Sequence, residues 1–150
     1  MEYRDLGNTG MRASVIGLGA EHLDNKPFET ARDTIQTAAE GGVNIMDVFM
    51  PGREVRENIG RALAGSRKDW IIQGHIGSVD THQQYDISRD LALSQRYFED
   101  LLRYLNTDYI DIGMIHCIDT PRQTDAVLSD AFLGTRSSPK RPNAFLSSGA

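Results

Sequence analysis

Four short apolar runs, each ending in a polar or glycine-rich cluster, limit what this chain can fold into. The runs are SVIGLGAEH (14–22), VNIMDVF (43–49), WIIQGHIG (70–77) and YIDIGMIHCID (109–119). Near-continuous apolar runs of this length are typical of strands in a parallel sheet covered on both faces. Three strand–helix units and a fourth strand occupy about 120 residues, near 30 per unit. The pattern therefore predicts parallel strands, side by side in chain order with helices on one outer face, at 14–19, 43–48, 70–74 and 109–116.

Helical spacing of apolar residues follows the first three runs and returns once more near the end of the patterned sequence. The predicted helices lie at about 27–40, 53–64, 88–105 and 126–133. Residues 78–86 are polar and predict a long loop, whereas the Gly7–Gly10 stretch predicts the turn of an N-terminal hairpin. A solvated face of the second helix is expected to carry Arg53, Glu54, Arg56 and Glu57.

Three side chains of chemical interest come at or near the ends of the last three runs: Asp47, His75 and His116. The carboxyl ends of parallel strands meet at one edge of a sheet, where active sites are built, so we expect these side chains to cluster. A histidine can donate a proton at neutral pH, and a carboxylate within ~4–6 Å would favour its charged form. An aspartate in this place can also cap the following turn, and a strand-end histidine can be purely structural.

Composition limits the classes of binding partner and the cell compartment that we expect for this chain. A formal net charge of −5 gives no electrostatic reason to bind nucleic acid, and no apolar stretch approaches the ~20 residues that span a membrane. The charged N-terminus lacks the apolar region of a signal peptide. The single cysteine, Cys117, cannot form an internal disulfide, which fits a cytoplasmic protein. We expect Cys117 to be buried as a small apolar residue. We expect no metal site, because neighbouring strand residues such as His116 and Cys117 point to opposite faces.

The end of the chain differs from the rest. Residues 1–133 form one predicted α/β domain, whereas residues 134–150 have no period, three basic residues and no acid, and predict a disordered tail. The abrupt change fits a truncated or frame-shifted reading frame. A complete (β/α)₈ barrel needs roughly 250 residues, so the repeat would stop near its midpoint. Four strands would leave two open sheet edges, through which we expect self-association.

Four motifs in order resemble the aldo-keto reductase family over residues 1–119. They are the N-terminal hairpin, GLGA (17–20), NIMDV (44–48) with ENIGRAL (57–63), and LNTDYIDIGMIH (105–116). The resemblance implies the N-terminal half of a (β/α)₈ TIM barrel whose N-terminal β-hairpin closes the bottom. It also implies reversible hydride transfer between NADP(H), less often NAD(H), and a small carbonyl substrate or its alcohol.

The family's site has an aspartate, a tyrosine, a lysine and a histidine, and the resemblance carries over two of them. Asp47 matches the aspartate and His116 the histidine, whereas Gly52 occupies the tyrosine position and His75 the lysine position. Glycine cannot replace the phenol that protonates the carbonyl oxygen, so His75 or His116 is the expected acid. The resemblance also places Gly19 and Asp47 beside the cofactor, although GLGA lacks the G-x-G-x-x-G fingerprint.

Two functional readings remain open from the sequence. The first is an NADP(H)-dependent oxidoreductase present as its N-terminal half, inactive in isolation because later strands of the family supply most cofactor contacts. The second is a non-catalytic remnant or half-barrel binding module that self-associates. The altered site resembles a divergent branch whose members often carry an iron–sulfur segment after the barrel, and this chain has no cysteines for such a cluster.

Overall fold

A parallel sheet organises the molecule. The computed structural model of the chain describes residues 1–82, 84–128 and 144–146. Five strands follow one another across the sheet in chain order, and every adjacent pair is parallel. They are β3 (Leu18–Gly19), β4 (Ile45–Val48), β5 (Ile71–Ile76), β8 (Ile112–Ile115) and β9 (Ala144–Leu146). The predicted parallel order of the first four strands is confirmed, and within the described residues the sheet does not close into a barrel.

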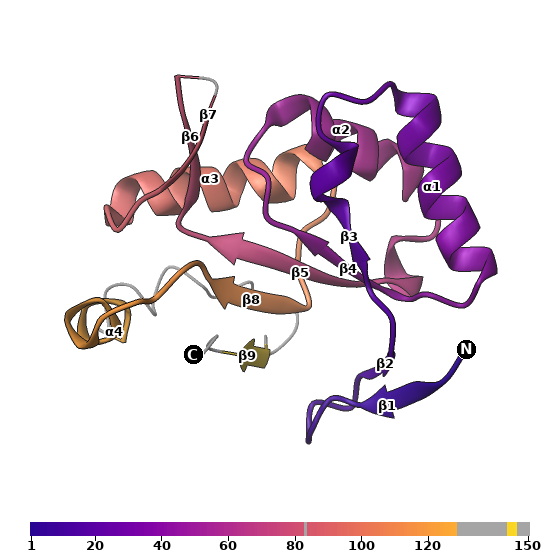
Figure 1. Cartoon of the computed structure of the whole chain (residues 1–150), viewed down its shortest axis with the longest axis horizontal. Coiled ribbons are helices and arrows are strands. Elements are labelled where there is room, and N and C mark those ends of the chain that lie inside the picture. Colours follow the sequence, from indigo (N-terminus) through magenta and orange to yellow (C-terminus); the bar gives the residue numbers. More distant parts are fainter. Residues whose placement is uncertain (83, 129–143, 147–150) are drawn as a thin grey trace.

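Three helices cover one side of this sheet, which we call the outer face (Figure 1). They are α1 (Phe28–Glu40), α2 (Arg53–Ala62) and α3 (Leu91–Tyr104). Alternate strand residues point to this face, so Met46, Val48 and Ile72 are at most 1% exposed and pack with helix residues such as Leu101. The Asp90 side chain fixes the start of α3 by accepting a hydrogen bond from Leu93 N at 2.7 Å. None of the helices in the described ranges is long and apolar enough to cross a membrane.

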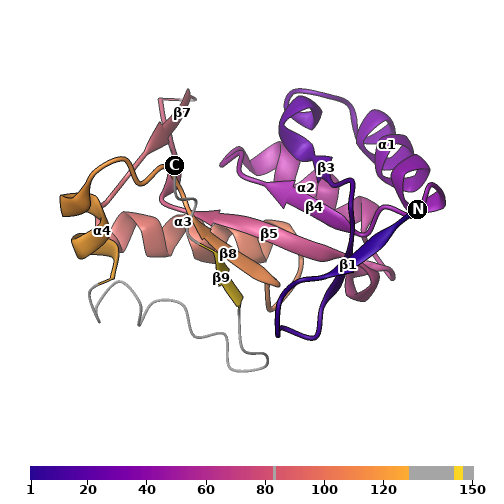
Figure 2. The ribbon, with the colours of Figure 1, turned by 60° about the horizontal axis from the view of Figure 1, so that its bottom comes forward.

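The other side, the inner face, is covered at its amino end by the predicted N-terminal hairpin. Strands β1 (Tyr3–Asp5) and β2 (Arg12–Ser14) pair antiparallel, and Figure 1 shows them below the sheet, away from α1 and α2. In Figure 2, β1 lies in front of the start of β5. Ala13 of this hairpin clusters with inner-face side chains Ile71 and Ile112. The Asn44 side chain ties the hairpin to the start of β4 by accepting from Ser14 N at 2.7 Å. The carboxyl end of the inner face is left for polar residues.

The first predicted strand, 14–19, is wrong over much of its length. Only Leu18–Gly19 belongs to the sheet, while Val15 and Ile16 are 49% and 61% exposed. The chain bends here as it passes from the hairpin to the sheet, and Ser14 Oγ stabilises the bend by donating to Ile16 O at 2.7 Å. The apolar pair therefore lies at a junction rather than inside a strand.

Residues 78–86 also differ from the prediction, because they form a second hairpin instead of a loop. Strands β6 (Ser78–Thr81) and β7 (Gln84–Ile87) pair antiparallel beyond the end of β5. Gly77, with φ of +90°, allows the sharp departure from β5, and its carbonyl accepts from Ser88 N at 2.8 Å at the base of the hairpin. Tyr97 Oη donates to Asp80 O at 2.7 Å and fastens the hairpin to α3.

Arg56 departs from the predicted solvated face of α2. The side chain is fully buried and donates to Met50 O at 2.8 Å and to Tyr97 O at 3.1 Å. Burial lowers the pKa of Arg56 to about 10. The guanidinium is drawn inward because it satisfies carbonyl oxygens of the loop after β4 and of α3.

The last elements differ from prediction as well. Helix α4 (Pro121–Val127) begins earlier than the predicted 126–133, because Thr120 and Gln123 form a capping box and Pro121 suits the first turn. The rest of that predicted helix, from residue 129, lies outside the described residues. Within the predicted tail, Ala144–Leu146 forms strand β9 beside β8, and the predicted disorder of residues 134–150 stays a prediction. The remaining tail residues lie outside the description.

Candidate active site

Strand alternation places the predicted site residues on the inner face at the carboxyl ends of the strands. Asp47 is the third residue of β4 and pairs in register with Gly19 on one side and Gln73 on the other. His75 lies two residues beyond Gln73, on the same face of β5. His116 follows the end of β8, and its backbone N–H extends the ladder by donating to Ile76 O at 3.0 Å. The parallel register therefore converges these side chains.

Asp47, His75 and His116 make one continuous hydrogen-bonded cluster. His75 Nε2 lies 3.0 Å from Asp47 Oδ2, and His75 Nδ1 lies 2.6 Å from His116 Nδ1. Gln73 Nε2 also donates to Asp47 Oδ2. The clustering expected from the sequence is present, and the catalytic role of these residues stays a prediction.

The carboxylate fixes the direction of these hydrogen bonds. An ionised Asp47 only accepts, so His75 donates to it from Nε2. A neutral His75 then has a lone pair on Nδ1, and His116 must donate to it from its own Nδ1. This assignment leaves His116 Nε2 as an acceptor.

Two aromatic residues at this site were not expected from the sequence. Tyr85 on β7 places its hydroxyl in hydrogen-bond contact with His116 Nε2. Phe49, just after β4, stacks on the His116 ring with centroids 5.7 Å apart and meets Tyr85 edge-on at 5.5 Å. In β7, Tyr85 and Ile87 alternate with polar residues, which is a pattern typical of a strand. The polar residues around them favoured the prediction of a loop instead of a hairpin.

Local electrostatics keep His116 uncharged. Burial lowers its pKa to about 4, and His75 and Arg89 act in the same direction against smaller opposing effects of Asp47 and Asp119. Arg89 also holds the backbone here, since its Nη2 donates to His116 O at 2.5 Å. At neutral pH His116 is therefore a neutral imidazole that can both accept and pass on a proton.

Cys117 is not the buried strand residue that was expected. It is partly exposed, and its φ of +47° turns the chain out of the strand directly after His116. Arg89 donates to the Cys117 carbonyl and supports this conformation. Within the described residues, no group of three or more His, Cys, Asp or Glu side chains is arranged to hold a metal ion.

A cavity of about 360 Å³ adjoins the cluster on the inner face. Its lining comes from the bend, β3, β4 and β5: Ser14, Val15, Gly17, Leu18, Gly19, Ile45, Asp47 and Gln73. A side-chain carbon at Gly19 would meet nothing within 4 Å, so the floor is open there. The lining combines small apolar groups with the Ser14 hydroxyl, the Gln73 amide and the Asp47 carboxylate, and it holds no cationic side chain that would bind phosphates. Of the dinucleotide that the family resemblance implies, this lining is compatible with the uncharged nicotinamide end and not with the phosphates.

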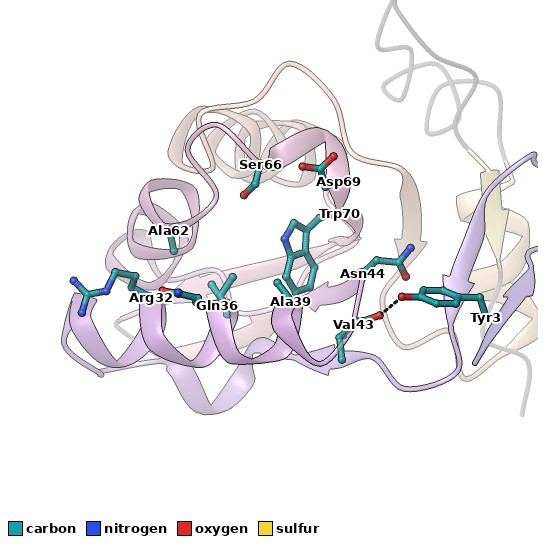
Figure 3. Close-up of a pocket in the computed structure, with 12 residues that line it drawn as sticks. Tyr3, Arg32, Gln36, Ala39, Val43, Asn44, Ala62, Ser66, Asp69 and Trp70 are labelled. Atoms are coloured by element: carbon teal, nitrogen blue, oxygen red, sulfur yellow. Dashed lines mark hydrogen bonds between the residues drawn. The ribbon is translucent and has the colours of Figure 1, made fainter. Parts of the chain in front are cut away.

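A second cavity, of about 420 Å³, lies away from this cluster. Figure 3 shows it between α1 and the start of β5, lined in part by Arg32, Gln36 and Trp70. Tyr3 closes one side, where its hydroxyl donates to Gly42 O at 2.8 Å. Because Val43 and Trp70 precede their strands, this cavity is at the amino ends, opposite the Asp47 cluster.

Comparison with known proteins places this geometry in a family. The model of the aldo/keto reductase family matches residues 15–132. L-galactose dehydrogenase of Arabidopsis thaliana is 30% identical over 128 residues, which are 79% of this chain and 38% of that protein. The chain thus spans less than half the length of this curated relative.

Solved structures similar to this chain come from the same family. A putative aldo-keto reductase from Pseudomonas aeruginosa is 28% identical with a TM-score of 0.73, over 89% of this chain and 53% of that one. The holo form of aldo-keto reductase AKR11C1 from Bacillus halodurans is 25% identical with a TM-score of 0.73, over 98% and 50% of the two chains. The parallel sheet with its outer helices corresponds to about half of such a TIM-barrel protein. This chain belongs to the aldo/keto reductase family.

Proposed function

We propose that this chain carries the carbonyl-reducing site of an NADP(H)-dependent oxidoreductase, with Asp47, His75 and His116 as its acid–base group. One observation carries the proposal: an unbroken hydrogen-bonded path runs from Asp47 through His75 to His116 at the carboxyl edge of the sheet. A path of this kind can store a proton on His75 against the Asp47 carboxylate and release it at His116. Both replacements of the family tetrad, Gly52 and His75, are then consistent with activity.

The reaction needs a hydride at the carbonyl carbon and a proton at the carbonyl oxygen. NADPH, when bound, supplies the hydride. The residues of this chain supply the proton and hold the oxygen, since Gly52 has no side chain to donate one. Gly19 and Asp47 form the floor on which the nicotinamide end would rest. Preference for NADP(H) over NAD(H) is part of the proposal and follows the family.

Oxidation of NADPH in the presence of small aldehydes and quinones tests this function. It should be measured on the 150-residue chain and on a completed barrel, in which residues 1–128 continue into the second half of an aldo/keto reductase relative. We expect negligible turnover by the chain alone and clear turnover by the completed barrel. His75→Ala and His116→Ala should each lower kcat of the completed barrel well beyond any change in KM.

Two results would contradict the proposal, and a third would contradict the expected inactivity of the short chain. A completed barrel that binds NADPH and reduces none of the substrates would remove the oxidoreductase function. Unchanged rates in both histidine variants would leave the function and remove the proposed acid–base group. Robust turnover by the short chain would show that the later strands are dispensable.

A second candidate function, a self-associating half-barrel, is favoured by the open side of the sheet. Among the residues that the structure describes, β3 pairs only with β4, and the neighbouring Val15 and Ile16 are 49% and 61% exposed. Unpaired edges and exposed apolar side chains favour association with a second copy. Light scattering should show dimers or larger species that weaken in Ile16→Glu. A monomer with sharp cooperative unfolding would exclude this candidate.

A further inference from the structure

We infer that Tyr85 is the catalytic residue that exchanges a proton with the substrate oxygen, and that His116, His75 and Asp47 relay the proton behind it. The inference rests on the proposed function. Its starting observation is the contact between the Tyr85 hydroxyl and His116 Nε2, the free end of the hydrogen-bonded cluster. A phenol from the β6–β7 hairpin thereby reaches the site that Gly52 cannot serve.

Exposure distinguishes Tyr85 from the residues behind it. Tyr85 is 39% exposed, whereas His75 is 8% exposed and lies between Asp47 and His116. A substrate approaching the carboxyl edge of the sheet therefore meets the phenol before it meets His75. Tyr85 is the outermost group of the path and Asp47 is its anchor.

The direction of the hydrogen bonds supports the same order. His116 Nε2 is an acceptor once the Asp47 carboxylate has fixed His75, so the Tyr85 hydroxyl donates to it. All three hydrogen bonds then point from Tyr85 toward Asp47. When all hydrogen bonds of the path point the same way, a proton can move along it in one direction. The hydrogen bonds reverse when a proton is added at the far end of the path.

The proposed step balances. In the loaded state His75 is an imidazolium that still donates from Nε2 to the Asp47 carboxylate, while the hydrogen bonds from His75 Nδ1 through His116 and Tyr85 point outward to the carbonyl oxygen. Bound NADPH would supply the hydride for the new C–H bond, and the π electrons of the carbonyl would move to its oxygen. The Tyr85 proton bonds to that oxygen, the His116 Nε2 proton moves to Tyr85, and the His75 Nδ1 proton moves to His116. The products are the alcohol, oxidised cofactor and the neutral path, which solvent reloads.

The charged and titratable neighbours favour relay rather than a stable phenolate. Burial raises the pKa of Tyr85, and Cys117 and Asp86 act in the same direction, while Arg89 opposes them. The phenol is therefore protonated at neutral pH. Because His116 returns a proton as the phenol gives one up, Tyr85 need not be a strong acid.

The hairpin gives Tyr85 a firm support. Ser78 at its base is fully buried, and its Oγ donates to Phe49 O at 2.5 Å. Tyr97 holds the same hairpin to α3, and Phe49 meets the Tyr85 ring edge-on. Contacts to both the sheet and a helix fix the position of the hydroxyl relative to His116.

Nuclear magnetic resonance of the histidine ring nitrogens tests the path in the chain itself. The hydroxyl of Tyr85 stabilises neutral His116, so Tyr85→Phe should raise the pKa of His116 by about half a unit or more. Tyr3→Phe is the matched control, because it removes a hydroxyl that hydrogen-bonds at the opposite end of the sheet. An unchanged His116 titration in Tyr85→Phe would overturn the inference.

Kinetics of the completed barrel test the catalytic role. Tyr85→Phe should lower kcat about 100-fold with little change in KM, while Tyr3→Phe keeps the unsubstituted rate. Fluorinated tyrosine at position 85, which has a more acidic phenol, should shift the pH dependence of kcat to lower pH. A purely structural Tyr85 would leave that pH dependence unmoved, which would overturn the inference. No turnover by the unsubstituted protein would instead overturn the proposed function, so the two failures are distinguishable.

Discussion

The two faces of one parallel sheet have opposite characters. On the outer face, Met46 and Ile72 are fully buried against the helices. On the inner face, their direct neighbours Asp47 and Gln73 are polar and line a cavity. Strand alternation alone produces this division, because consecutive residues point to opposite sides. Adjacent residues therefore serve different ends: the outer-face residues stabilise the fold and the inner-face residues line the candidate site. Substitutions can perturb the two separately.

The largest expected effect is on the chemistry of the inner face. Asp47→Asn removes the charge that holds a proton on His75, so turnover by the completed barrel should fall about 10²- to 10⁴-fold. Chemical unfolding of the same variant should differ little from that of the unsubstituted protein, because the Asp47 side chain is one-third exposed. Retained turnover, or a large loss of stability, would contradict the separation of chemistry and stability between the two faces.

The next largest effect is on the stability of the outer face. Ile72→Ala opens a cavity under the helices and should lower the free energy of unfolding by about 2–5 kcal/mol. Val15→Ala is the matched control, since that side chain is 49% exposed and should cost under about 1 kcal/mol. Urea unfolding followed by circular dichroism measures both. Equal losses in the two variants would mean that the helix-covered core does not dominate stability.

Gly60, inside α2, and Gly52, just before it, differ in how closely other atoms approach them. A side-chain carbon at Gly60 would lie 2.7 Å from Tyr104 O, so Gly60→Ala should cost about 1–3 kcal/mol by forcing α2 from α3. At Gly52 the nearest atom would be 3.4 Å away, and φ is −56°, so Gly52→Ala should change stability by under about 0.5 kcal/mol. Thermal melting compares the pair. A larger loss at Gly52 would contradict the packing described here.

The smallest expected effect is the pH dependence contributed by His116. Its pKa is about 4 in the folded protein against 6.5 for an ordinary histidine. Below pH 6.5 the unfolded state binds more protons, so stability falls between about pH 6.5 and 4 and is unaffected above that window. The ring is only half-buried, and we expect a loss of about 1–2 kcal/mol after solvent screening. His116→Ala should remove this part of the pH dependence, and His22→Ala should leave it; equal curves for all three proteins would contradict it.

Much of the fold could be predicted from the sequence because local signals agreed with the final packing. The β4 run reads as a buried strand and Gly7–Gly10 as a turn, and both are where the sequence predicts them. Val15 and Ile16 mislead because apolar character does not reveal whether anything covers a residue. Arg56 misleads because its carbonyl partners lie outside α2, and one of them, Tyr97 O, is 41 positions away in the sequence.

The candidate site was half predictable for a similar reason. Asp47, His75 and His116 follow from strand ends, which the sequence marks clearly. Tyr85 does not, because its contact depends on the β6–β7 hairpin folding back toward β8. This contact joins residues 31 positions apart, and no local periodicity in the sequence predicts it.

Deuterium transfer tests most directly whether the inner face performs carbonyl reduction. NADPH labelled at its transferable hydrogen is incubated with an aldehyde and the completed barrel, and the product alcohol is analysed by mass spectrometry. We expect labelled alcohol from the unsubstituted protein and little or none, at matched NADPH binding, from His116→Ala. Absence of label with the unsubstituted protein, or equal labelling by the variant, would contradict it.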